Sequence, residues 1–437
     1  MAPDQTFPLL TALVFLPALG GLLVAVFGAR RDALAPWLAV LFAGVTLVLA
    51  LWVFGDVKGD GFSEQRAWAP AAGFSFILES DELSSILVVW VALSTLLTLI
   101  STLPGVRTAV TVLFLETAAN GIFLAQDVFL VFAFLGGVVV LVCLLANVPR
   151  NVLMMATAGL TVLFGWFVRF YQMVYDQTGF ASTELARWRS LVLYPHEERS
   201  LFLLGACGIA LLVPAFTIAV KNAPRAHRLV LFATLGVIGT YLVLHLLVPL
   251  CPRGAEASSS WVLAFAALTM ASAGLARGFS VMAVGYHGLV LFGLFSFRES
   301  GVVGAELMMI AVAIGFFGLE LTTSRGIVWA FVLFLIGMPI VSVLVPAWGG
   351  DVRWASLGTL TFVIMAYRLV TLAKASPPME NVENHLRLRL SAAVVGLLSV
   401  SMIIGFRAWS LQVRPSAVDF LSSSSQRPGQ AGQAAQP

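Results

Sequence analysis

The stretch from Phe114 to Ala146, FLETAANGIFLAQDVFLVFAFLGGVVVLVCLLA, places one glutamate inside two consecutive apolar runs. Glu116 lies near the middle of the first run, and only Gln126 and Asp127 separate this run from the second. The pattern predicts two membrane-spanning helices joined by a very short polar turn. A charged side chain at bilayer depth costs about 3 kcal/mol on insertion scales, so we expect Glu116 to face other helices and to mark a pathway for ions or protons.

The composition of the whole chain predicts an all-α, polytopic integral membrane protein. Of its 437 residues, 59% are hydrophobic and 11% are charged, and the mean hydropathy is +0.96. A soluble domain would carry about 25% charged residues. At about 20 residues per span, the apolar runs between Pro8 and Leu411 have room for about fourteen helices. The runs are continuous and rich in Leu, Val and Ala, which excludes a barrel of short alternating strands.

The apolar runs also give the expected domain organisation. We predict a transmembrane domain over residues 1–411, interrupted by polar extramembrane loops at 56–82 and 175–200, and a disordered polar tail over 412–437. The first run lacks a basic n-region and an AxA-type site, so we interpret it as a retained span. Besides the two helices in the opening stretch, the expected spans cover residues 8–28, 36–55, 83–102, 152–174, 201–220, 229–250, 261–276, 279–297, 302–323, 327–346, 355–374 and a last segment that ends near Trp409.

The basic residues indicate an orientation. If the N-terminus is outside, the inside connectors are short and carry Lys and Arg, whereas the outside loops mix basic residues with most of the acidic ones. The positive-inside rule then predicts that both termini lie on the outer, periplasmic side of the cell membrane.

Several classes of function are excluded. The net charge is +3 with no basic tract, so nucleic acid is not an expected partner. Cys143, Cys207 and Cys251 lack metal-ligand spacing and are expected to be small core residues. The chain contains no CxxC, P-loop, HExxH or GxSxG motif. We therefore expect no cofactor, metal or redox centre in this chain, and any electron transfer would belong to partner subunits.

Each titratable residue in or beside a span permits two interpretations. Glu116 either conducts protons or stays protonated and hydrogen-bonded to a neighbouring helix. Lys221 ends its span, where it could extend to the membrane surface. His245 and His287, the latter beside Tyr286, fit either a proton relay or buried hydrogen-bonded histidines. In the same way, prolines inside two of the expected helices either break them to open a polar site or simply kink them. These prolines are Pro214 and Pro339.

Several segments together resemble one known family. It comprises the antiporter-like membrane subunits of NADH-quinone oxidoreductase (respiratory complex I), with the M subunit the most similar in pattern. The large Mrp sodium/proton antiporter subunits and the membrane subunits of hydrogenase complexes also belong to it. The matching segments are WAPAAGFSFILESDELS (68–84), LFLETAANGIFLAQDVFLVFAF (113–134), GTYLVLHLLVPLCP (239–252) and LFGLFSF (291–297).

The resemblance implies a fold, a function and a set of partners. The fold would have fourteen transmembrane helices containing two repeated five-helix bundles. The subunit would pass protons across the membrane through a buried chain of Glu, Lys and His residues, driven by quinone reduction elsewhere in the complex. Its partners would be other membrane subunits of a respiratory-type complex and the lipid bilayer, and quinone would be a substrate of the assembly only.

The departures from the family concern the residues that would carry protons. Gly136 and Val237 stand at the usual glutamate and lysine positions of the fifth and eighth helices, and His245 stands where an arginine is usual. The seventh and twelfth helices, normally broken in the middle, are shorter here. Lys221 matches the broken-helix lysine only if a deletion follows it; otherwise that position falls near Ala206. The remaining family-matching candidates are Asp351 for the acidic residue that ends the twelfth helix, Arg277 for a basic residue of the tenth, and Tyr286 or His287 for its histidine.

Three hypotheses remain open from the sequence. The first is a proton-translocating subunit that uses Glu116, Lys221 and the histidines in a rearranged path. The second is a structural paralogue that has kept the fold and docking surfaces without the pump. The third is a cation/proton antiporter of the Mrp type or a membrane subunit of a hydrogenase complex. The first two differ in whether Glu116, Lys221, His245 and His287 line one hydrated axis near the middle of the membrane. Movement of ions by the purified chain alone in vesicles would favour an independent antiporter.

Overall fold

The computed structural model describes residues 8–28, 33–56, 62–146, 148–275, 278–321, 325–344 and 352–375. Within these ranges, ten helices are long and apolar enough to cross a membrane, and three shorter apolar helices accompany them. These helices confirm the predicted multi-pass, all-α fold. The predicted last span near Trp409 and the polar tail lie outside the described residues.

The helices begin and end close to the predicted boundaries. Most differences are a few residues at the polar ends, where sequence patterns are least informative. In chain order the elements are α1 (Leu9–Gly28), α2 (Ala35–Asp56), β1 (Ser63–Ala69), η1 (Pro70–Ala72), β2 (Phe74–Glu79), α3 (Glu82–Thr102), α4 (Val106–Leu124), α5 (Val128–Ala146), α6 (Arg150–Thr178), α7 (Leu185–Arg189), α8 (Pro195–Asn222), α9 (Arg225–Tyr241), η2 (Leu242–Leu247), α10 (Val248–Leu250), α11 (Pro252–Ala257), α12 (Ser259–Gly274), α13 (Phe279–Leu294), α14 (Glu299–Leu321), α15 (Arg325–Pro339), η3 (Ile340–Leu344) and α17 (Val352–Ala375).

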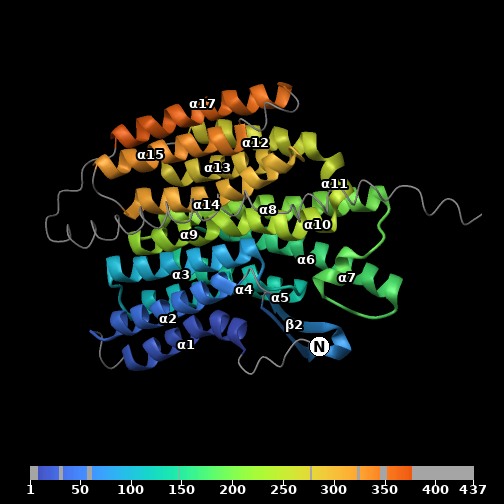
Figure 1. The fold of residues 1–437 in the computed structure, drawn as a ribbon, viewed down its shortest axis with the longest axis horizontal. Coiled ribbons are helices and arrows are strands. Elements are labelled where there is room, and N and C mark those ends of the chain that lie inside the picture. The colour runs from blue at the N-terminus through green and yellow to red at the C-terminus, as the bar shows by residue number, and fades with distance from the viewer. Residues whose placement is uncertain are drawn as a thin grey trace, which may run out of the picture.

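The long helices lie side by side, and the chain advances from α1 at one edge of the bundle to α17 at the other (Figure 1). Within the bundle α1 packs on α4, α6 on α8 and α12 on α13. Helix α9 contacts α3, α4, α8, α13 and α14, so it is the central helix of the described fold. Pro214 lies inside α8 and Pro339 inside α15.

A two-stranded hairpin occupies the first predicted polar loop. Strand β1 pairs with β2 in antiparallel register, and Gly73 closes the turn with a positive φ of 69°. A β-carbon at Gly73 would lie 2.1 Å from the carbonyl oxygen of Ala181, so only glycine fits this close approach. The hairpin and α7 lie at the same end of the bundle (Figure 1), which we call the hairpin side.

Carboxylates hold the hairpin side together by capping helix starts. Glu64 of β1 accepts hydrogen bonds from the backbone N–H groups of Leu10 and Thr11 at the start of α1, at 2.6 and 3.1 Å. Asp81 accepts one from the N–H of Ser84 at 2.6 Å and so begins α3 with a capping box. Such bonds satisfy backbone donors that a helix leaves unpaired at its N-terminus.

Asp127 joins three segments on the hairpin side. Its carboxylate accepts hydrogen bonds from the N–H of Leu130 at 3.1 Å, the N–H of Ser75 at 3.2 Å and the hydroxyl of Thr183 at 2.5 Å. Burial raises the pKa of the Asp127 carboxyl, and these hydrogen bonds oppose the rise. The short polar turn predicted between the two spans of the stretch from Phe114 to Ala146 is therefore the point where the hairpin, α5 and the segment before α7 meet.

Candidate functional site

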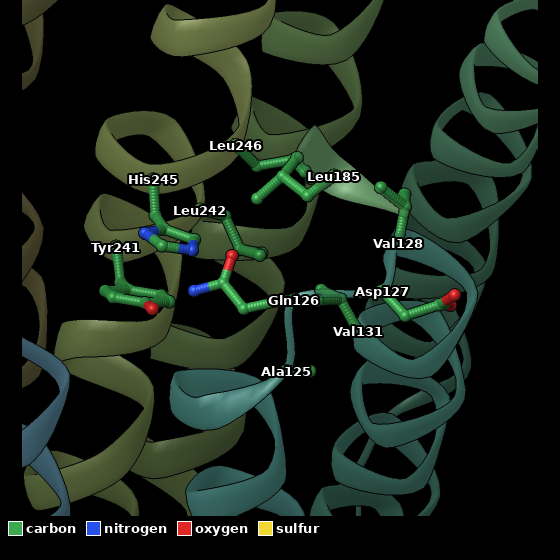
Figure 2. Close-up of a pocket in the computed structure, with 10 residues that line it drawn as sticks. All are labelled: Ala125, Gln126, Asp127, Val128, Val131, Leu185, Tyr241, Leu242, His245 and Leu246. Carbon is green, nitrogen blue, oxygen red and sulfur yellow. The ribbon is translucent and has the colours of Figure 1, made fainter. Parts of the chain in front are cut away.

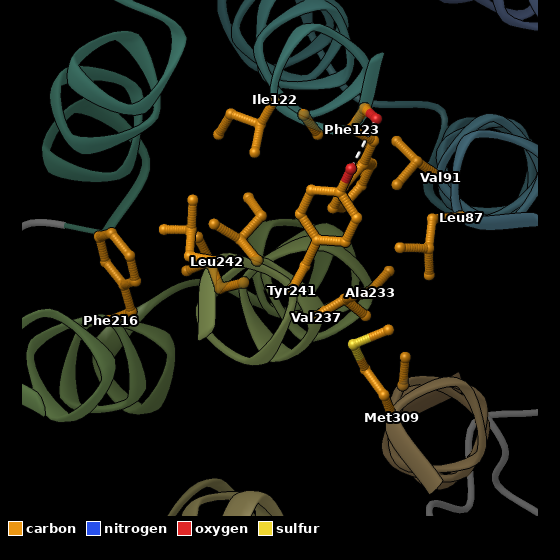
Figure 3. Packing of buried hydrophobic residues seen from close by; sticks show 14 of the residues in the cluster. Leu87, Val91, Ile122, Phe123, Phe216, Ala233, Val237, Tyr241, Leu242 and Met309 are labelled. Atoms are coloured by element: carbon orange, nitrogen blue, oxygen red, sulfur yellow. Dashed lines mark hydrogen bonds between the residues drawn. The ribbon is translucent and has the colours of Figure 1, made fainter. Parts of the chain in front are cut away.

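Glu116 lies on the face of α4 that turns toward α9. Glu116, Asn120 and Phe123 are four and three residues apart, so they share one helix face. At the end of this face the carbonyl oxygen of Phe123 accepts a hydrogen bond from the Tyr241 hydroxyl at 2.8 Å, and the two rings meet edge to face with centroids 5.0 Å apart (Figure 3). Glu116 and Asn120 are both fully buried. The Glu116 side chain therefore lies among helices and does not face lipid.

This buried face contains polar atoms that the packing leaves unpaired. Within the described residues, neither carboxylate oxygen of Glu116 and neither amide atom of Asn120 has a hydrogen-bond partner. The hydroxyls of Thr117 on the same helix and Thr95 on α3 share this property. Side chains one helical turn apart have β-carbons about 5–6 Å apart, so Glu116 and Asn120 lie within reach of one bridging water.

His287 lies on the opposite side of α9. A β-carbon on Gly236 would be 3.6 Å from Cε1 and Nε2 of the His287 ring, which places the imidazole against α9. The ring is 7% exposed, and its Nδ1 has no hydrogen-bond partner among the described residues. Its neighbour Tyr286 instead donates a hydrogen bond to the carbonyl oxygen of Leu335 on α15 at 2.9 Å. Of the two family-matching candidates in this helix, only His287 therefore faces α9.

Three small cavities follow α9. One of about 20 Å³ lies between Thr217, Gly236 and His287. A second of about 10 Å³ is lined by Thr240 and Glu306. A third of about 10 Å³ is lined by Gln126, Tyr241 and His245. A buried water needs roughly 10–15 Å³ and polar partners, so each cavity is at or above the size of one water molecule.

The third cavity lies at the hairpin end of α9. Figure 2 shows the Gln126 side chain directed toward Tyr241 and His245, whereas the Asp127 carboxylate points the other way. The His245 ring stacks on Tyr241, with centroids 4.9 Å apart and planes at 11°. Its Nδ1 lies 3.9 Å from a carboxylate oxygen of Asp81. His245 sits in the π-helical segment η2, a local irregularity that often marks functional positions.

Two charged residues beside His245, Arg189 and Asp81, were not predicted as site residues from the sequence. The Arg189 guanidinium of α7 donates a hydrogen bond to the His245 carbonyl oxygen at 3.2 Å. Burial lowers the pKa of the Arg189 guanidinium, while the negative charges of Asp81 and Glu79 oppose this change. Glu306 of α14 was also missed, although a glutamate inside an apolar run is the signal that identified Glu116. Arg189 and Asp81 gave no such signal because both lie in polar segments.

The opposite end of α9 carries its own polar contacts. Arg228 pairs with Glu320 of α14 at 2.5 Å. His227 Nδ1 lies 2.6 Å from the carbonyl oxygen of Leu145, and its Nε2 lies 3.1 Å from the Thr108 hydroxyl. These contacts tie the start of α9 to α14, to the end of α5 and to the start of α4.

Several predicted site residues are not placed. Arg277 and Asp351 lie outside the described residues, and Lys221 is described only by its backbone at the end of α8. Two of the departures from the family pattern, Val237 and Gly136, are placed. Val237 is fully buried on α9, one turn from Tyr241. A β-carbon at Gly136 would meet nothing within 4 Å, so this position on α5 points away from the rest of the described chain.

The comparisons with known proteins agree with this fold. No protein-family model matches the chain. It is 26% identical over 370 residues to a NAD(P)H-quinone oxidoreductase chain 4 of a Nostoc species, covering 76% of this chain and 64% of the relative. It is 22% identical over 338 residues to the NADH-quinone oxidoreductase subunit M of Rickettsia conorii, covering 70% and 68%. The chain thus spans about two thirds of the length of these relatives.

Two solved structures share the fold. A chain of respiratory complex I from Thermus thermophilus with bound NADH aligns with a TM-score of 0.80 at 19% identity, over 94% of this chain and 99% of that one. A chain of the Mrp complex from a Dietzia species aligns with a TM-score of 0.74 at 14% identity, over 96% and 98%.

The fold is that of the multi-pass, antiporter-like membrane chains found in respiratory complex I and the Mrp complex. More particularly, the chain is a divergent relative of the antiporter-like membrane subunits of NADH-quinone oxidoreductases, known as subunit M or chain 4. The resemblance expected from the sequence is confirmed.

Proposed function

We propose that the chain is a membrane subunit of an NADH-quinone oxidoreductase-type complex and takes part in proton translocation coupled to quinone reduction. The observation that carries this proposal is the fully buried Glu116, whose carboxylate lies beside Asn120 and faces the central helix α9. A buried ionisable group in a membrane protein marks a pathway for ions or protons by default. Electron transfer belongs to partner subunits, and this chain contributes the membrane path.

The path we propose runs along α9. Glu116 and Asn120 lie on one side of this helix and His287 on the other. Thr240 with Glu306, and Gln126 with His245, line the water-sized cavities toward the hairpin side. Protons cross hydrocarbon only through titratable groups or water at close spacing. These groups therefore provide stations at several depths, and Lys221, Asp351 and Arg277 remain predicted members of the same path.

A structural subunit without a pump is the second candidate. The observation that favours it is Val237, a fully buried apolar side chain on α9 at the position where the family usually has a lysine. Gly136 likewise provides no carboxylate. On this alternative the chain keeps the docking surfaces of the family and conducts no protons.

Glu116→Gln separates the two candidates. The substitution keeps the size of the side chain and removes its titratable group. If Glu116 conducts, proton uptake by reconstituted complex should fall about tenfold or more while quinone reduction by partner subunits continues, because a lost relay group adds at least about 1.4 kcal/mol to the barrier. The measurement is proton translocation per electron in proteoliposomes that contain the complete complex.

Glu64→Gln is the matched control. Glu64 is also a buried carboxylate, but it caps α1 far from α9. This variant should translocate protons like the wild type. Unchanged translocation in Glu116→Gln would contradict the conducting role and leave the structural subunit as the function.

We also propose the orientation and the partners. The hairpin side would face the periplasm, because Arg107, Arg150 and Arg228 lie at the opposite ends of α4, α6 and α9. The N-terminus would then be outside, and other membrane subunits of the complex would be the direct partners. Labelling of a cysteine introduced at Ser190, in intact cells with an impermeant maleimide, checks the orientation. Labelling only after the cells are opened would reverse it.

A further inference from the structure

A large apolar cavity lies between α8, α9, α12 and α13. Its volume is about 310 Å³, and its walls are almost entirely apolar side chains. Two lining hydroxyls already donate hydrogen bonds within their own helices, Thr240 to the Val237 carbonyl at 3.0 Å and Thr269 to the Ala266 carbonyl at 2.7 Å. His287 also lines this cavity, although its Nδ1 atom is buried and so is not open to a ligand there.

The cavity opens sideways between α8 and α12. Leu203, Trp261 and Phe265 line it and are 44%, 71% and 42% exposed. Cys207, also in the lining, is an exposed free thiol on α8. Leu203, Cys207 and Phe265 lie within the apolar runs of α8 and α12, so we expect the medium outside this part of the mouth to be lipid hydrocarbon. The cavity is thus continuous with the acyl region of the bilayer.

The apolar lining argues against water as the occupant. An apolar cavity of about 150 Å³ stays dry and binds small hydrocarbons, whereas water needs two to four polar partners. The space here is twice that size and falls in the range of ligand-binding pockets, which begins at about 300 Å³. Leaving it empty would forfeit the dispersion contacts of its whole lining.

We propose that the cavity is a binding site for one fatty acyl chain of a membrane phospholipid, which enters between α8 and α12 and ends near His287. The headgroup stays at the membrane surface. Given the proposed function, the acyl chain has a further effect: it separates His287 from the bilayer, so that water reaches the imidazole only through the cavity of about 20 Å³ beside Gly236. The binding site itself does not depend on proton translocation.

Cavity-filling substitutions test the site directly. Ala206→Phe and Ala210→Phe each place a ring where the acyl chain would lie, because both alanines line the cavity. Native mass spectrometry of the full chain, released from phosphatidylcholine nanodiscs, counts retained lipids. We expect one tightly retained phospholipid per wild-type chain and an affinity for that lipid about tenfold lower in either variant, which corresponds to about 1.4 kcal/mol of lost binding.

The control is Leu268→Phe, which adds a similar ring on α12 at a position that is 67% exposed and outside the cavity lining. It should retain the lipid. Thermal unfolding of all variants checks that they are folded. Two cavity substitutions are used so that the test still stands if one of these variants does not fold. Equal retention in wild type and both folded cavity variants would overturn the proposal.

Cys207 gives an independent test in the same protein. In a Cys143→Ala, Cys251→Ala background, Cys207 should react with a membrane-soluble maleimide and resist a charged, impermeant one. Fast reaction with the charged reagent would show an aqueous cavity and overturn the acyl site. Because the proposed acyl chain lies beside Cys207, removal of lipid by detergent should speed the reaction with the membrane-soluble reagent, and an unchanged rate would also overturn the site. Neither result depends on proton pumping. Failure of this test would therefore overturn the acyl site alone, and failure of the Glu116→Gln test would overturn the proposed function alone.

Discussion

The two faces of α9 are packed differently. Toward α3 and α4, two buried hydrogen bonds hold the helix in place. The Trp90 indole donates to the Ala233 carbonyl at 3.1 Å, and the Tyr241 hydroxyl donates to the Phe123 carbonyl at 2.8 Å. Toward α8, α12 and α13 it borders the cavity of about 310 Å³. The first face holds Glu116 beside its unpaired polar neighbours, and the second leaves His287 beside open space.

This difference indicates a division of roles. A tightly packed face fixes the positions of its polar groups, because close-packed interiors tolerate little change in side-chain volume. A face that borders a cavity can accept added atoms and can exchange its contents with the bilayer. We therefore expect the face toward α3 and α4 to determine stability and the geometry of Glu116, and the face toward the cavity to be tolerant of substitution.

The largest expected effect comes from truncating an aromatic ring on each face. Phe123 is fully buried against Tyr241, whereas Phe265 at the cavity mouth is 42% exposed. Phe123→Ala should lower the free energy of unfolding by about 3 kcal/mol, because it leaves a cavity in a packed interior. Phe265→Ala should cost about 1 kcal/mol or less, because lipid replaces the lost contacts. Titration with sodium dodecyl sulfate, followed by circular dichroism, measures both.

Equal costs for the two variants would contradict the proposed difference between the faces. Leu268→Phe, the lipid-facing control of the cavity experiment, should unfold at the same detergent concentration as the wild type. Leu268→Phe thus shows how much the unfolding midpoint changes when the substituted residue lies on neither face of α9.

The sequence predicted the membrane helices well, because a span is encoded locally in about 20 apolar residues. Helix α4 and helix α5 are joined at Gln126 and Asp127, as the pattern indicated. The hairpin was predicted only as a polar loop. Its strands have six or seven residues each, and their pairing depends on contacts with Asp127 and Ala181 that are distant in sequence. The predicted domain boundary after residue 411 lies outside the described residues.

The candidate site was predicted in part. Glu116 was proposed because a charge inside an apolar run is visible in sequence, whereas its neighbour Asn120 was not named as a candidate. The contact between His287 and Gly236 joins two helices fifty residues apart, so no local pattern contains it. The same holds for Arg189 beside His245, which depends on how α7 folds back onto η2. The side chain of Lys221 stays a sequence-based prediction.

A smaller effect is expected from removing one hydroxyl on each face. Tyr241→Phe deletes the hydrogen bond to the Phe123 carbonyl and should cost about 1 kcal/mol. Thr240→Val removes a hydroxyl that bonds only to the Val237 carbonyl of its own helix, so it should change the stability by about 0.5 kcal/mol or less. The same detergent titration measures both variants, with Phe265→Ala as a reference for the cavity face. A larger loss in Thr240→Val than in Tyr241→Phe would reverse the assignment of the two faces.

The smallest effect comes from adding one methyl group to α9 at two glycines three residues apart. A β-carbon at Gly236 would meet only the His287 ring at 3.6 Å, an ordinary contact, whereas one at Gly239 would lie 2.5 Å from a methyl carbon of Val213. Gly236→Ala should therefore stabilise the chain by about 0.5 kcal/mol through its higher helix propensity. In Gly239→Ala the overlap with the stiff Val213 side chain should cancel that gain or exceed it. Since both substitutions change propensity equally, their difference in unfolding midpoint isolates the packing around each glycine. A midpoint for Gly236→Ala below that of Gly239→Ala would mean that the His287 ring does not leave the room for a methyl group that its 3.6 Å separation indicates.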